Sequence, residues 1–429
     1  MSQTRTLSAS TPRDVAATRP GWLTRVAGNT LSKIGRKGLL AQLNKLQFGE
    51  LTVEEGGQTH RFGAPTSDGL AATVRIHDAR FWTELLAGGT VGAGESYRQG
   101  WWTSDDLTQV IRMLVRNRSV MEDMEGGLAA LATPLRKAAH WANRNTVEGS
   151  RKNIEAHYDL SNDFFSLILD PTMTYSCGIY LSEDATLEEA SIEKIDRLCR
   201  KLQLKPGMSL LEIGTGWGAL AIHAAKNYGV QVTTTTISER QAEWAERRIA
   251  EEGLGDQITL LRQDYRKLEG KFDRIVSVEM IEAIGWQYFD SYFEVLGERL
   301  KDDGLAAIQA ITIADQHYES ARTSVDFIQK YIFPGCCIPS ISALLGAATN
   351  SSDLKLVGME DITPHYVRTL AEWRENMFAN REQVHALGLD DKFMRTWDYY
   401  FSYCEGGFAE GQIGDVQLMF GKPRYEVPA

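Results

Sequence analysis

One stretch near the middle of the chain, SLLEIGTGWGALAIHAA at Ser209–Ala225, joins a strand, a tight turn and a helix within a short segment. The apolar run at its start is typical of a buried strand, and the Ala-rich pattern at its end is typical of a helix. Between them Gly214, Gly216 and Gly218 carry no side chain, so the backbone can approach a ligand closely. The unpaired N–H groups at the start of the helix favour electronegative atoms. The stretch therefore predicts a nucleotide-type pocket, although a purely structural strand-to-helix turn uses the same glycines.

Strand-like and helix-like segments alternate from about residue 190 onward. The predicted strands are 209–213, 231–235, 258–261, 272–278 and 305–311. Such alternation indicates a parallel sheet covered by helices on both faces, so we expect an α/β, doubly wound, mostly parallel sheet. Its ligand should lie outside the carboxyl ends of the strands, at 214–218. A last strand-like run at 415–420 is expected to be antiparallel and to close the edge of the sheet.

The part of the chain before this sheet is organised differently. Residues 1–20 are rich in Ser, Thr, Ala and Pro without periodicity, so a disordered basic start is expected. A small α+β domain is predicted over 21–120, a helical linker over 121–152, and the main domain over 153–429 with an apolar insert at 314–355. The elements predicted in the small domain are a helix within 35–51, strands at 51–62 and 71–76, and helices at 81–87 and 106–115.

Composition and charge exclude several classes of protein. The chain has 429 residues, a net charge of -11, no run of 18 apolar residues and no apolar signal-peptide core in its first thirty residues. We therefore expect a cytoplasmic protein that does not bind nucleic acid. The five cysteines form no CxxC pair, so neither a disulfide framework nor a metal site is expected. Residues 1–45 nevertheless carry eight Lys and Arg against one acid, so this segment is either a solvated basic tail or a contact with an anionic membrane surface.

The ends of the second and third strands indicate what the pocket holds. The second strand runs into VTTTTISERQ, which lacks the acid that holds a ribose in dinucleotide-binding sheets. We therefore expect the polar contacts with the ribose to come from Thr236, Ser238 and Gln241 instead. After the third strand, Asp264 could accept a hydrogen bond from an adenine amino group, and Tyr265 could pack on its ring. Each residue alone is more typical of a turn or a cap, but together they follow successive strand ends.

Several motifs carry a resemblance to a known family. They are EAHYDLSNDFFSLILDPTMTYSCGIY (155–180), LLEIGTGWG, TTTTISERQ, SVEMIEAIG (277–285), KYIFPGCCIPS (330–340) and HYVRTLAEW (365–373). From about residue 150 to the C-terminus the chain resembles the cyclopropane-fatty-acyl-phospholipid synthases, a family that includes the mycolic acid cyclopropane synthases. Residues 50–115 resemble, less sharply, the lipid-associated N-terminal domain of the bacterial phospholipid enzymes. The resemblance implies a class I methyltransferase fold, S-adenosylmethionine as methyl donor, an unsaturated phospholipid acyl chain at the inner face of the membrane as substrate, and a homodimer.

The resemblance also assigns the cofactor site. It implies that Gly214 and Gly216 hold the methionine part, beside Tyr175 and Ser176. The residues after the second strand would flank the ribose and adenine, and those after the third would lie at the adenine edge. The complete predicted set is Tyr175, Ser176, Glu212, Gly214, Gly216, Gly218, Thr236, Ile237, Gln241, Asp264, Tyr265 and Arg266.

The reaction that the resemblance implies is methyl transfer to a cis alkene, followed by removal of a proton so that a three-membered ring closes. The site must exclude water, stabilise a cation and hold a base. Aromatic faces at Tyr158, Phe164, Phe165 and Tyr180 could stabilise the cation, although each could equally be a core residue.

In the family the base is a bound bicarbonate held by a cysteine, a glutamate, a histidine and a tyrosine. The matching residues here are Cys177, Glu282 and Tyr366, with Gln309 in the place of the histidine. Cys404 matches a cysteine suspected of a catalytic role in the family, and a structural role on a helix is its alternative.

Two departures leave the outcome of the reaction open. Gln309 can donate a hydrogen bond to an anion but cannot shuttle a proton, and Ala283 follows Glu282 where the family commonly has a histidine. The expected product is a cyclopropane ring, and the alternative is a methylene branch formed by loss of a neighbouring proton. A small-molecule methyltransferase and a non-catalytic lipid-binding module are the rival functions. Glu279, three residues before Glu282, is expected to be a cap or an acceptor on the cofactor side.

Overall fold

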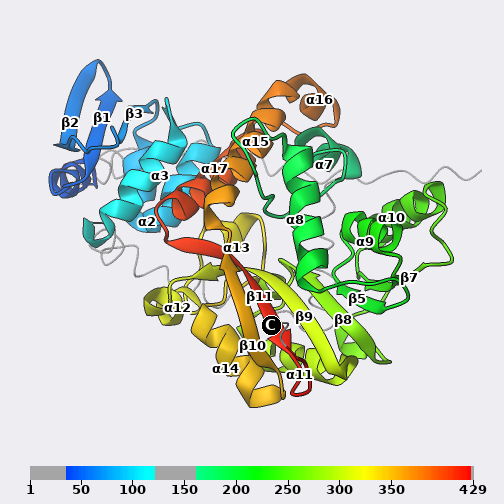
Figure 1. Cartoon of the computed structure of the whole chain (residues 1–429). Coiled ribbons are helices and arrows are strands. Elements are labelled where there is room, and N and C mark those ends of the chain that lie inside the picture. Colours follow the sequence, from blue (N-terminus) through cyan, green and yellow to red (C-terminus); the bar gives the residue numbers. More distant parts are fainter. Residues whose placement is uncertain (1–34, 121–160, 427–429) are drawn as a thin grey trace, which may run out of the picture.

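The computed structural model describes residues 35–120 and 161–426 (Figure 1). The predictions for the disordered start at 1–20, for most of the basic segment, for the linker at 121–152 and for Tyr158 lie outside these residues. Within the described parts of the chain, every helix falls short of the length or the apolar character required to cross a bilayer.

A seven-stranded sheet forms the centre of the larger unit, in the order β10-β11-β9-β8-β5-β6-β7. Its strands are β5 (Ser209–Ile213), β6 (Gln231–Thr235), β7 (Ile258–Leu261), β8 (Phe272–Val278), β9 (Leu300–Ile313), β10 (Lys355–Asp361) and β11 (Ile413–Gly421). β5 to β9 pair in parallel, whereas β11 is antiparallel to both of its neighbours. The predicted α/β, doubly wound, mostly parallel sheet is therefore confirmed.

The predicted position of the last strand is wrong. β11 is antiparallel as expected, but it lies between β9 and β10, and β10 is the edge strand. β10 escapes detection because it is mostly exposed or half-buried and Gly358 follows a break in its pairing register. An edge strand of this kind lacks the continuous apolar run that marks strands buried on both faces.

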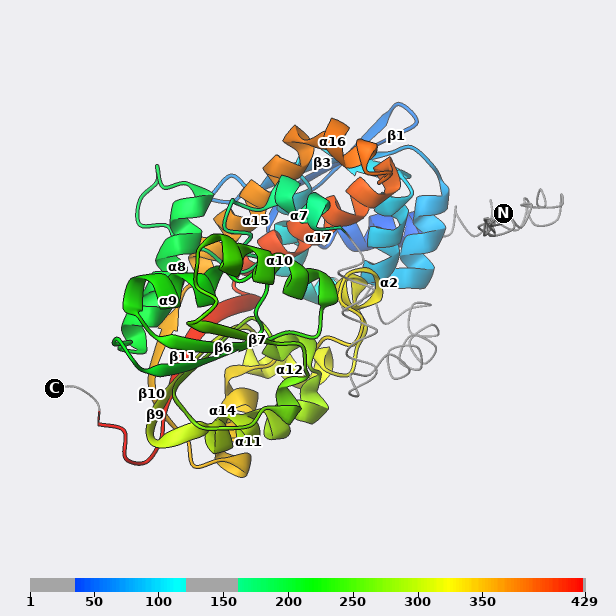
Figure 2. The ribbon, with the colours of Figure 1, turned by 90° about the vertical axis from the view of Figure 1, so that its right-hand side faces the viewer.

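Alternate residues of the strands point to opposite faces, which explains how two helical layers form. Leu210 and Ala307 pack in one core with α8 (Leu187–Lys201), α9 (Ala219–Tyr228) and α10 (Glu239–Glu251). Leu211 and Ile308 pack in a second core with α11 (Phe289–Arg299) and α14 (Ile341–Ser351). Figure 2 shows the two layers on opposite sides of the sheet. The apolar stretch 341–348 thus packs against α11 and the sheet.

A second sheet, in the order β2-β1-β3-β4, forms the smaller N-terminal unit with α2 and α3. Its elements are β1 (Gly49–Glu55), β2 (Gln58–Ala64), β3 (Ala71–Ile76), α2 (Arg80–Arg98), β4 (Trp102–Ser104) and α3 (Leu107–Arg116). The single strand predicted at 51–62 is wrong, because the chain reverses at Gly56 and Gly57. Both glycines have positive φ angles, 56° and 80°, as a two-residue hairpin turn of type I′ requires.

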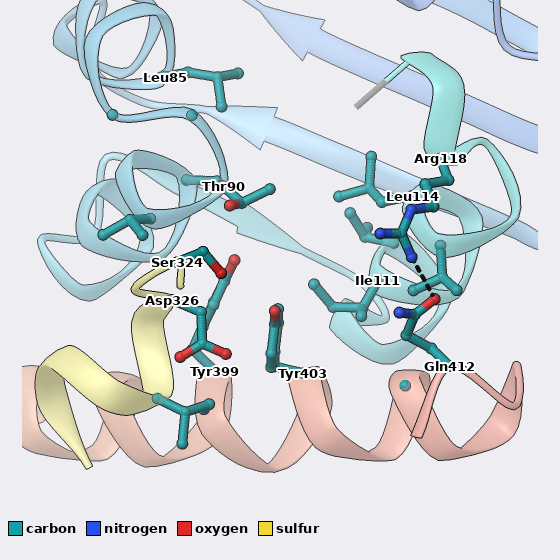
Figure 3. A pocket seen from close by; sticks show the side chains of 18 of the residues that line it. Leu85, Thr90, Ile111, Leu114, Arg118, Ser324, Asp326, Tyr399, Tyr403 and Gln412 are labelled. Carbon is teal, nitrogen blue, oxygen red and sulfur yellow. Dashed lines mark hydrogen bonds between the residues drawn. The ribbon is translucent and has the colours of Figure 1, made fainter. Parts of the chain in front are cut away.

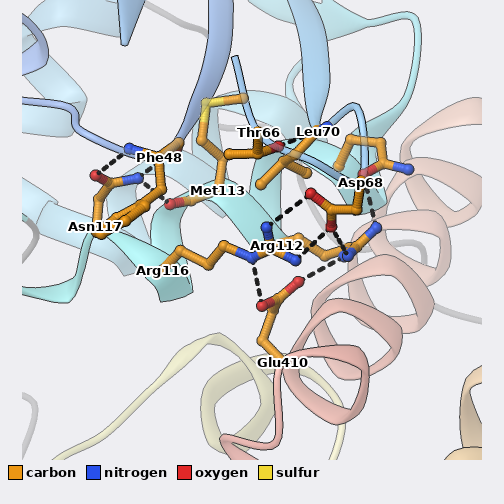
Figure 4. A network of polar contacts seen from close by, with 10 residues as sticks. Phe48, Thr66, Asp68, Leu70, Arg112, Met113, Arg116, Asn117 and Glu410 are labelled. Atoms are coloured by element: carbon orange, nitrogen blue, oxygen red, sulfur yellow. Dashed lines mark hydrogen bonds and ion pairs between the residues drawn. The ribbon is translucent and has the colours of Figure 1, made fainter. Parts of the chain in front are cut away.

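The long helix α17 (Asp391–Ala409) joins the two units. It packs against α15 (Thr363–Ala379) of the larger unit and against α2 and α3 of the smaller one (Figure 1). Just beyond its end, Glu410 accepts hydrogen bonds from Nε of Arg112 at 2.7 Å and Nε of Arg116 at 2.6 Å. Both arginines also pair with Asp68, and the bond from Arg116 holds the pKa of this carboxyl well below its usual range (Figure 4). This network ties the loop before β3 to the last helix of the larger unit.

Candidate functional site

The glycine-rich turn after β5 has the geometry of a ligand cradle. Gly214, Gly216 and Gly218 have φ angles of 102°, 52° and 89°, which side chains rarely adopt. Among the described residues, no atom beyond the two chain neighbours lies within 4 Å of the position that a Cβ would take on Gly216, and only the Met280 side chain approaches that of Gly214, at 3.5 Å. A Cβ on Gly218 would instead come within 3.2 Å of Ala245. The first two glycines therefore leave room for a ligand, and the third allows α9 to pack on α10.

The residues after β6 are mostly engaged with one another. Ser238 caps α10 by accepting from the Gln241 backbone, and Thr236 donates from its hydroxyl to Oε1 of Gln241 at 3.1 Å. Ile237 between them is half-buried. On β5, burial raises the pKa of Glu212 to about 8, although the hydroxyl of Thr234 donates to its Oε2 at 2.5 Å. The structure thus gathers these predicted residues at the carboxyl ends of β5 and β6.

After β7, Asp264 and Arg266 form an ion pair, and the side chain of Tyr265, the residue between them in the sequence, is buried. Nε and Nη2 of Arg266 donate to the two oxygens of Asp264 at 2.8 and 2.6 Å. Burial opposes ionisation of Asp264, but these bonds outweigh it and lower the pKa of the carboxyl. Tyr265 packs edge-on against Tyr292, with ring centroids 5.7 Å apart, and burial raises its pKa to about 12. The ring of Tyr265 belongs to the hydrophobic core that includes residues of α11.

The loop before α8 places Tyr175 and Ser176 near the same strand ends. Lys194, a buried lysine of α8, donates to the hydroxyl of Ser176 at 2.8 Å. The hydroxyl of Tyr175 lies 3.1 Å from that of Tyr400, and its ring packs against Trp373. Both predicted residues are therefore fixed by partners on helices.

A carboxylate of the protein itself lies where three of the residues predicted to hold the base meet. Oε1 of Glu279 accepts from the backbone N–H of Cys177 and from Nε2 of Gln309, both at 2.8 Å. Its Oε2 accepts from the hydroxyl of Tyr366 at 2.6 Å. Glu279 directly follows β8 and has a φ of 48°, a left-handed backbone conformation that is uncommon for a residue with a side chain. Glu279 was expected to be a cap or an acceptor on the cofactor side; it is an acceptor, and its partners are the residues that were predicted to hold the base.

Glu282 lies beside this group of residues. It belongs to the short turn η2 (Ile281–Ala283), where Oε1 accepts from the backbone N–H of Ile311 at 2.5 Å. Its Oε2 has no hydrogen-bond partner among the described residues. Burial, together with the charge of Glu279, raises the pKa of Glu282 to about 8, so this side chain is mostly protonated at neutral pH.

The thiol of Cys177 is fully buried, and burial raises its pKa well above the usual value. This side chain is therefore a neutral thiol, and the residue reaches Glu279 through its backbone. A further acid, Asp415 of β11, is fully buried and accepts from Nε2 of Gln309 at 3.0 Å. An aspartate inside the apolar run GDVQLMF is the sequence signal that could have identified it.

A cavity of about 470 Å³ lies between the two units (Figure 3). Leu85, Ile111 and Leu114 supply apolar wall from the smaller unit, and Tyr399 and Tyr403 of α17 supply wall from the larger one. Residues of the stretch 317–338 line its other side, so this is the part of the predicted insert that reaches the cavity.

The cavity is connected to the turn of Glu282 through one of its lining residues. Cys337 lines the cavity, and the backbone N–H of Cys337 donates to the backbone oxygen of Glu282 at 2.8 Å. Cys404 of α17 also lines this cavity. Burial raises the pKa of its thiol above the usual value, so it too is neutral.

Comparison with known proteins gives consistent matches. A family model described as mycolic acid cyclopropane synthetase matches residues 146–418. The chain is 39% identical over 338 residues to the tuberculostearic acid methyltransferase of Mycobacterium tuberculosis, covering 77% of this chain and 78% of that protein. It is 35% identical over 376 residues to the cyclopropane-fatty-acyl-phospholipid synthase of Escherichia coli strain K12, covering 84% and 91%.

Solved structures give the same picture. The mycolic acid cyclopropane synthase CmaA1, complexed with SAH and CTAB, matches with a TM-score of 0.60 and 33% identity, covering 63% of this chain and 98% of that one. Coclaurine N-methyltransferase, bound to N-methylheliamine and SAH, matches with a TM-score of 0.58 at 19% identity, covering 76% and 98%, and shares the fold.

Proposed function

The chain belongs to the mycolic acid cyclopropane synthetase family, and on that premise we propose that it methylates the cis double bond of an unsaturated fatty acyl chain in a phospholipid, with S-adenosylmethionine as donor. The observation that carries the proposal is the convergence of Cys177, Gln309 and Tyr366 on the carboxylate of Glu279. This convergence supports a proton acceptor at Glu279, whose neighbour Met280 approaches the turn that would hold the donor.

The residues at the strand ends fit S-adenosylmethionine. Gly214 and Gly216 leave space for close approach of its methionine part, and Thr236 and Gln241 offer polar atoms for its ribose and adenine. When bound, this donor supplies a methyl group to one alkene carbon, the electrons of the broken C–S bond staying with sulfur and the positive charge passing to the other alkene carbon. The chain's own residues then have to keep water away and remove a proton.

Glu279 takes that proton in the proposed mechanism. Burial raises the pKa of Glu279, and three hydrogen bonds to its oxygens oppose that shift, so the side chain is suited to accept a proton. The donors that the resemblance assigns to bicarbonate already serve Glu279, so we infer that this side chain does the work of the bound bicarbonate. Proton loss from the added methyl group lets the C–H electron pair form the third bond of a cyclopropane ring.

A methylene branch is the second candidate product. It forms if a hydride first moves from the methylated carbon to the cationic carbon and Glu279 then takes a proton from the added methyl group, so that this C–H pair makes an exomethylene double bond. The 39% identity to a tuberculostearic acid methyltransferase favours this outcome, as does the replacement of the family's histidine by Gln309.

We assign the acyl chain to the cavity between the two units. Its volume of about 470 Å³ falls in the usual range of ligand sites, and its apolar wall suits a hydrocarbon chain and excludes water from the cation. The smaller unit would then act as a lipid-associated domain at the inner membrane surface. A homodimer remains the expectation from the resemblance.

The deciding experiment incubates the full chain with S-adenosylmethionine and vesicles of monounsaturated phosphatidylglycerol. Mass spectrometry detects the gain of one CH₂ group by the lipid, and NMR of the isolated lipid distinguishes cyclopropane ring protons from exomethylene protons. Binding of S-adenosylmethionine without any methylated lipid would refute the proposed function.

A further inference from the structure

A row of polar side chains crosses the sheet from the carboxylate cluster to the surface. Gln309 of β9 lies opposite Gln417 of β11, and Gln417 lies opposite Glu360 of β10. Both glutamines are fully buried within otherwise apolar strands. Lys201, at the end of α8, lies over the outer part of this row, with its side chain 23% exposed. Buried amides at successive strand positions need partners, so the row has to form a connected chain.

Four hydrogen bonds connect the row to the carboxylates. Nζ of Lys201 donates to Oε1 of Gln417 at 2.7 Å. Nε2 of Gln417 donates to Oε1 of Gln309 at 3.0 Å. Nε2 of Gln309 then donates one hydrogen to Glu279 at 2.8 Å and the other to Asp415 at 3.0 Å.

The groups at the two ends of this hydrogen-bonded row determine which way each glutamine amide points. An ammonium group can only donate, so the oxygen of Gln417 has to face Lys201 and its NH₂ group has to face Gln309. The oxygen of Gln309 is then occupied, and its NH₂ group has to face the carboxylates. If Gln417 turned over, two donors would face each other at Lys201. Lys201 thus fixes, from the outer end, the orientation in which Gln309 donates to Glu279, and the carboxylates favour the same orientation from the inner end.

We propose that Lys201 is a positioning residue for the reaction, because through Gln417 it holds the amide of Gln309 in the orientation that donates to Glu279. The inference rests on the proposed role of Glu279 as the base. Without Lys201, Gln417 and Gln309 can both turn over, and the oxygen of Gln309 would then face the carboxylate of Glu279. An acceptor in that place disfavours the ionised form of the base.

Other groups also act on Glu279, and none of them changes when Lys201 is replaced. The charged and titratable side chains that act on it are Cys177 before α8, Lys194 on α8, Glu282 in η2, Tyr366 on α15, Tyr400 on α17 and Asp415 on β11. Lys201 itself pairs with Glu360, whose other partner is Arg197 at 2.6 Å. An altered pH profile in a Lys201 variant therefore reports a change in the orientation of the amides of Gln417 and Gln309.

The test compares Lys201→Met with Lys201→Arg, which keeps the donors, and with Glu360→Gln, which removes only the exposed partner. Methyl transfer from S-adenosylmethionine to monounsaturated phosphatidylglycerol vesicles is measured across pH. For K201M we expect kcat to fall by about tenfold near neutral pH and its acid limb to move up by about one pH unit, with KM for S-adenosylmethionine within about twofold. K201R and E360Q should stay within about twofold of wild type at every pH.

A K201M profile that coincides with that of wild type would overturn the inference. If K201M does not fold, Gln417→Leu gives the answer, because it leaves Lys201 paired with Glu360 and frees the oxygen of Gln309; it should show the same shift. Glu279→Gln tests the role of Glu279 as the base separately from the role of Lys201 as a positioning residue. Full activity of E279Q would refute Glu279 as the base, whereas an inactive E279Q with an unshifted K201M would refute only the role of Lys201.

Discussion

Replacement of Glu279 by glutamine removes the proposed proton acceptor and almost nothing else. The amide can keep its oxygen toward the N–H of Cys177 and Nε2 of Gln309, which donate at 2.8 Å to one oxygen of the carboxylate. Its NH₂ group then faces the hydroxyl of Tyr366, which can turn from donor to acceptor. The opposite orientation would set donors against donors. The variant should therefore fold normally, with its side chain in one defined orientation.

The expected loss of activity follows from the role of a general base. Such a group contributes about 100-fold to 10,000-fold to a rate, so E279Q should turn over at least about 100-fold more slowly, or about 2.7 kcal/mol of barrier. Affinity for S-adenosylmethionine should stay within about twofold, because the glycine turn is untouched. The assay is release of S-adenosylhomocysteine with monounsaturated vesicles, alongside calorimetric titration of the donor. Turnover above half of the wild-type rate would refute the assignment of Glu279.

Glycine at the same position provides a matched variant. Glu279 has a φ of 48°, which glycine adopts without strain, so Glu279→Gly should fold while leaving three hydrogen-bond donors around the space of the carboxylate. Added bicarbonate or formate can bind there, and we expect it to raise the rate of E279G by about tenfold or more, without effect on E279Q. An inactive E279Q together with an E279G that no anion rescues would assign Glu279 to organising the site.

Three further predictions concern the neighbouring residues. Burial raises the pKa of Glu282 to about 8, above its unfolded value of about 4.3, so its contribution to stability is present at low pH and is lost as pH rises toward 8. Glu282→Gln should therefore gain roughly 3 kcal/mol relative to wild type between about pH 5 and pH 8 in urea unfolding, and parallel curves would contradict the burial of this acid. Gly216→Val, at a φ of 52°, should weaken binding of S-adenosylmethionine by about 100-fold or more, whereas Gly253→Val, at an exposed turn with a φ of 68°, should leave it unchanged; equal affinities would refute the placement of the donor. Cys177→Ala keeps the backbone N–H that donates to Glu279, so its initial rate should stay within about threefold of wild type, and an inactive variant would show that the thiol is required.

Four of the parallel strands could be predicted from the sequence because each is a short segment rich in apolar or β-branched residues between turn residues. β5, β6, β7 and β8 match their predicted bounds, although β7 lies at the other edge of the sheet and is partly exposed. β10 was missed because an exposed edge strand with a glycine and a pairing irregularity carries no such pattern. In the smaller unit, the glycine pair at 56–57 was the available signal for the hairpin.

The carboxylate cluster depends on contacts that no local pattern encodes. Cys177 lies 102 residues before Glu279 and Tyr366 lies 87 residues after it, so only the folded chain brings both to this side chain. The same holds for Lys201 and Gln417, which are 216 residues apart. The resemblance named Cys177, Gln309 and Tyr366, but it described their common partner as bicarbonate and therefore gave no role to Glu279.

Part of the cavity wall comes from the smaller unit, whereas the residues around Glu279 belong to the larger one. Val53 and Leu85 of the smaller unit line the cavity, far in sequence from the residues around Glu279. If the proposed assignments hold, substitutions there should change the length of hydrocarbon that can be accommodated and leave Glu279 intact. Selection among chain lengths and choice of product can thus be altered independently of each other, and a chimera with a different N-terminal unit should retain its chemistry while preferring another lipid.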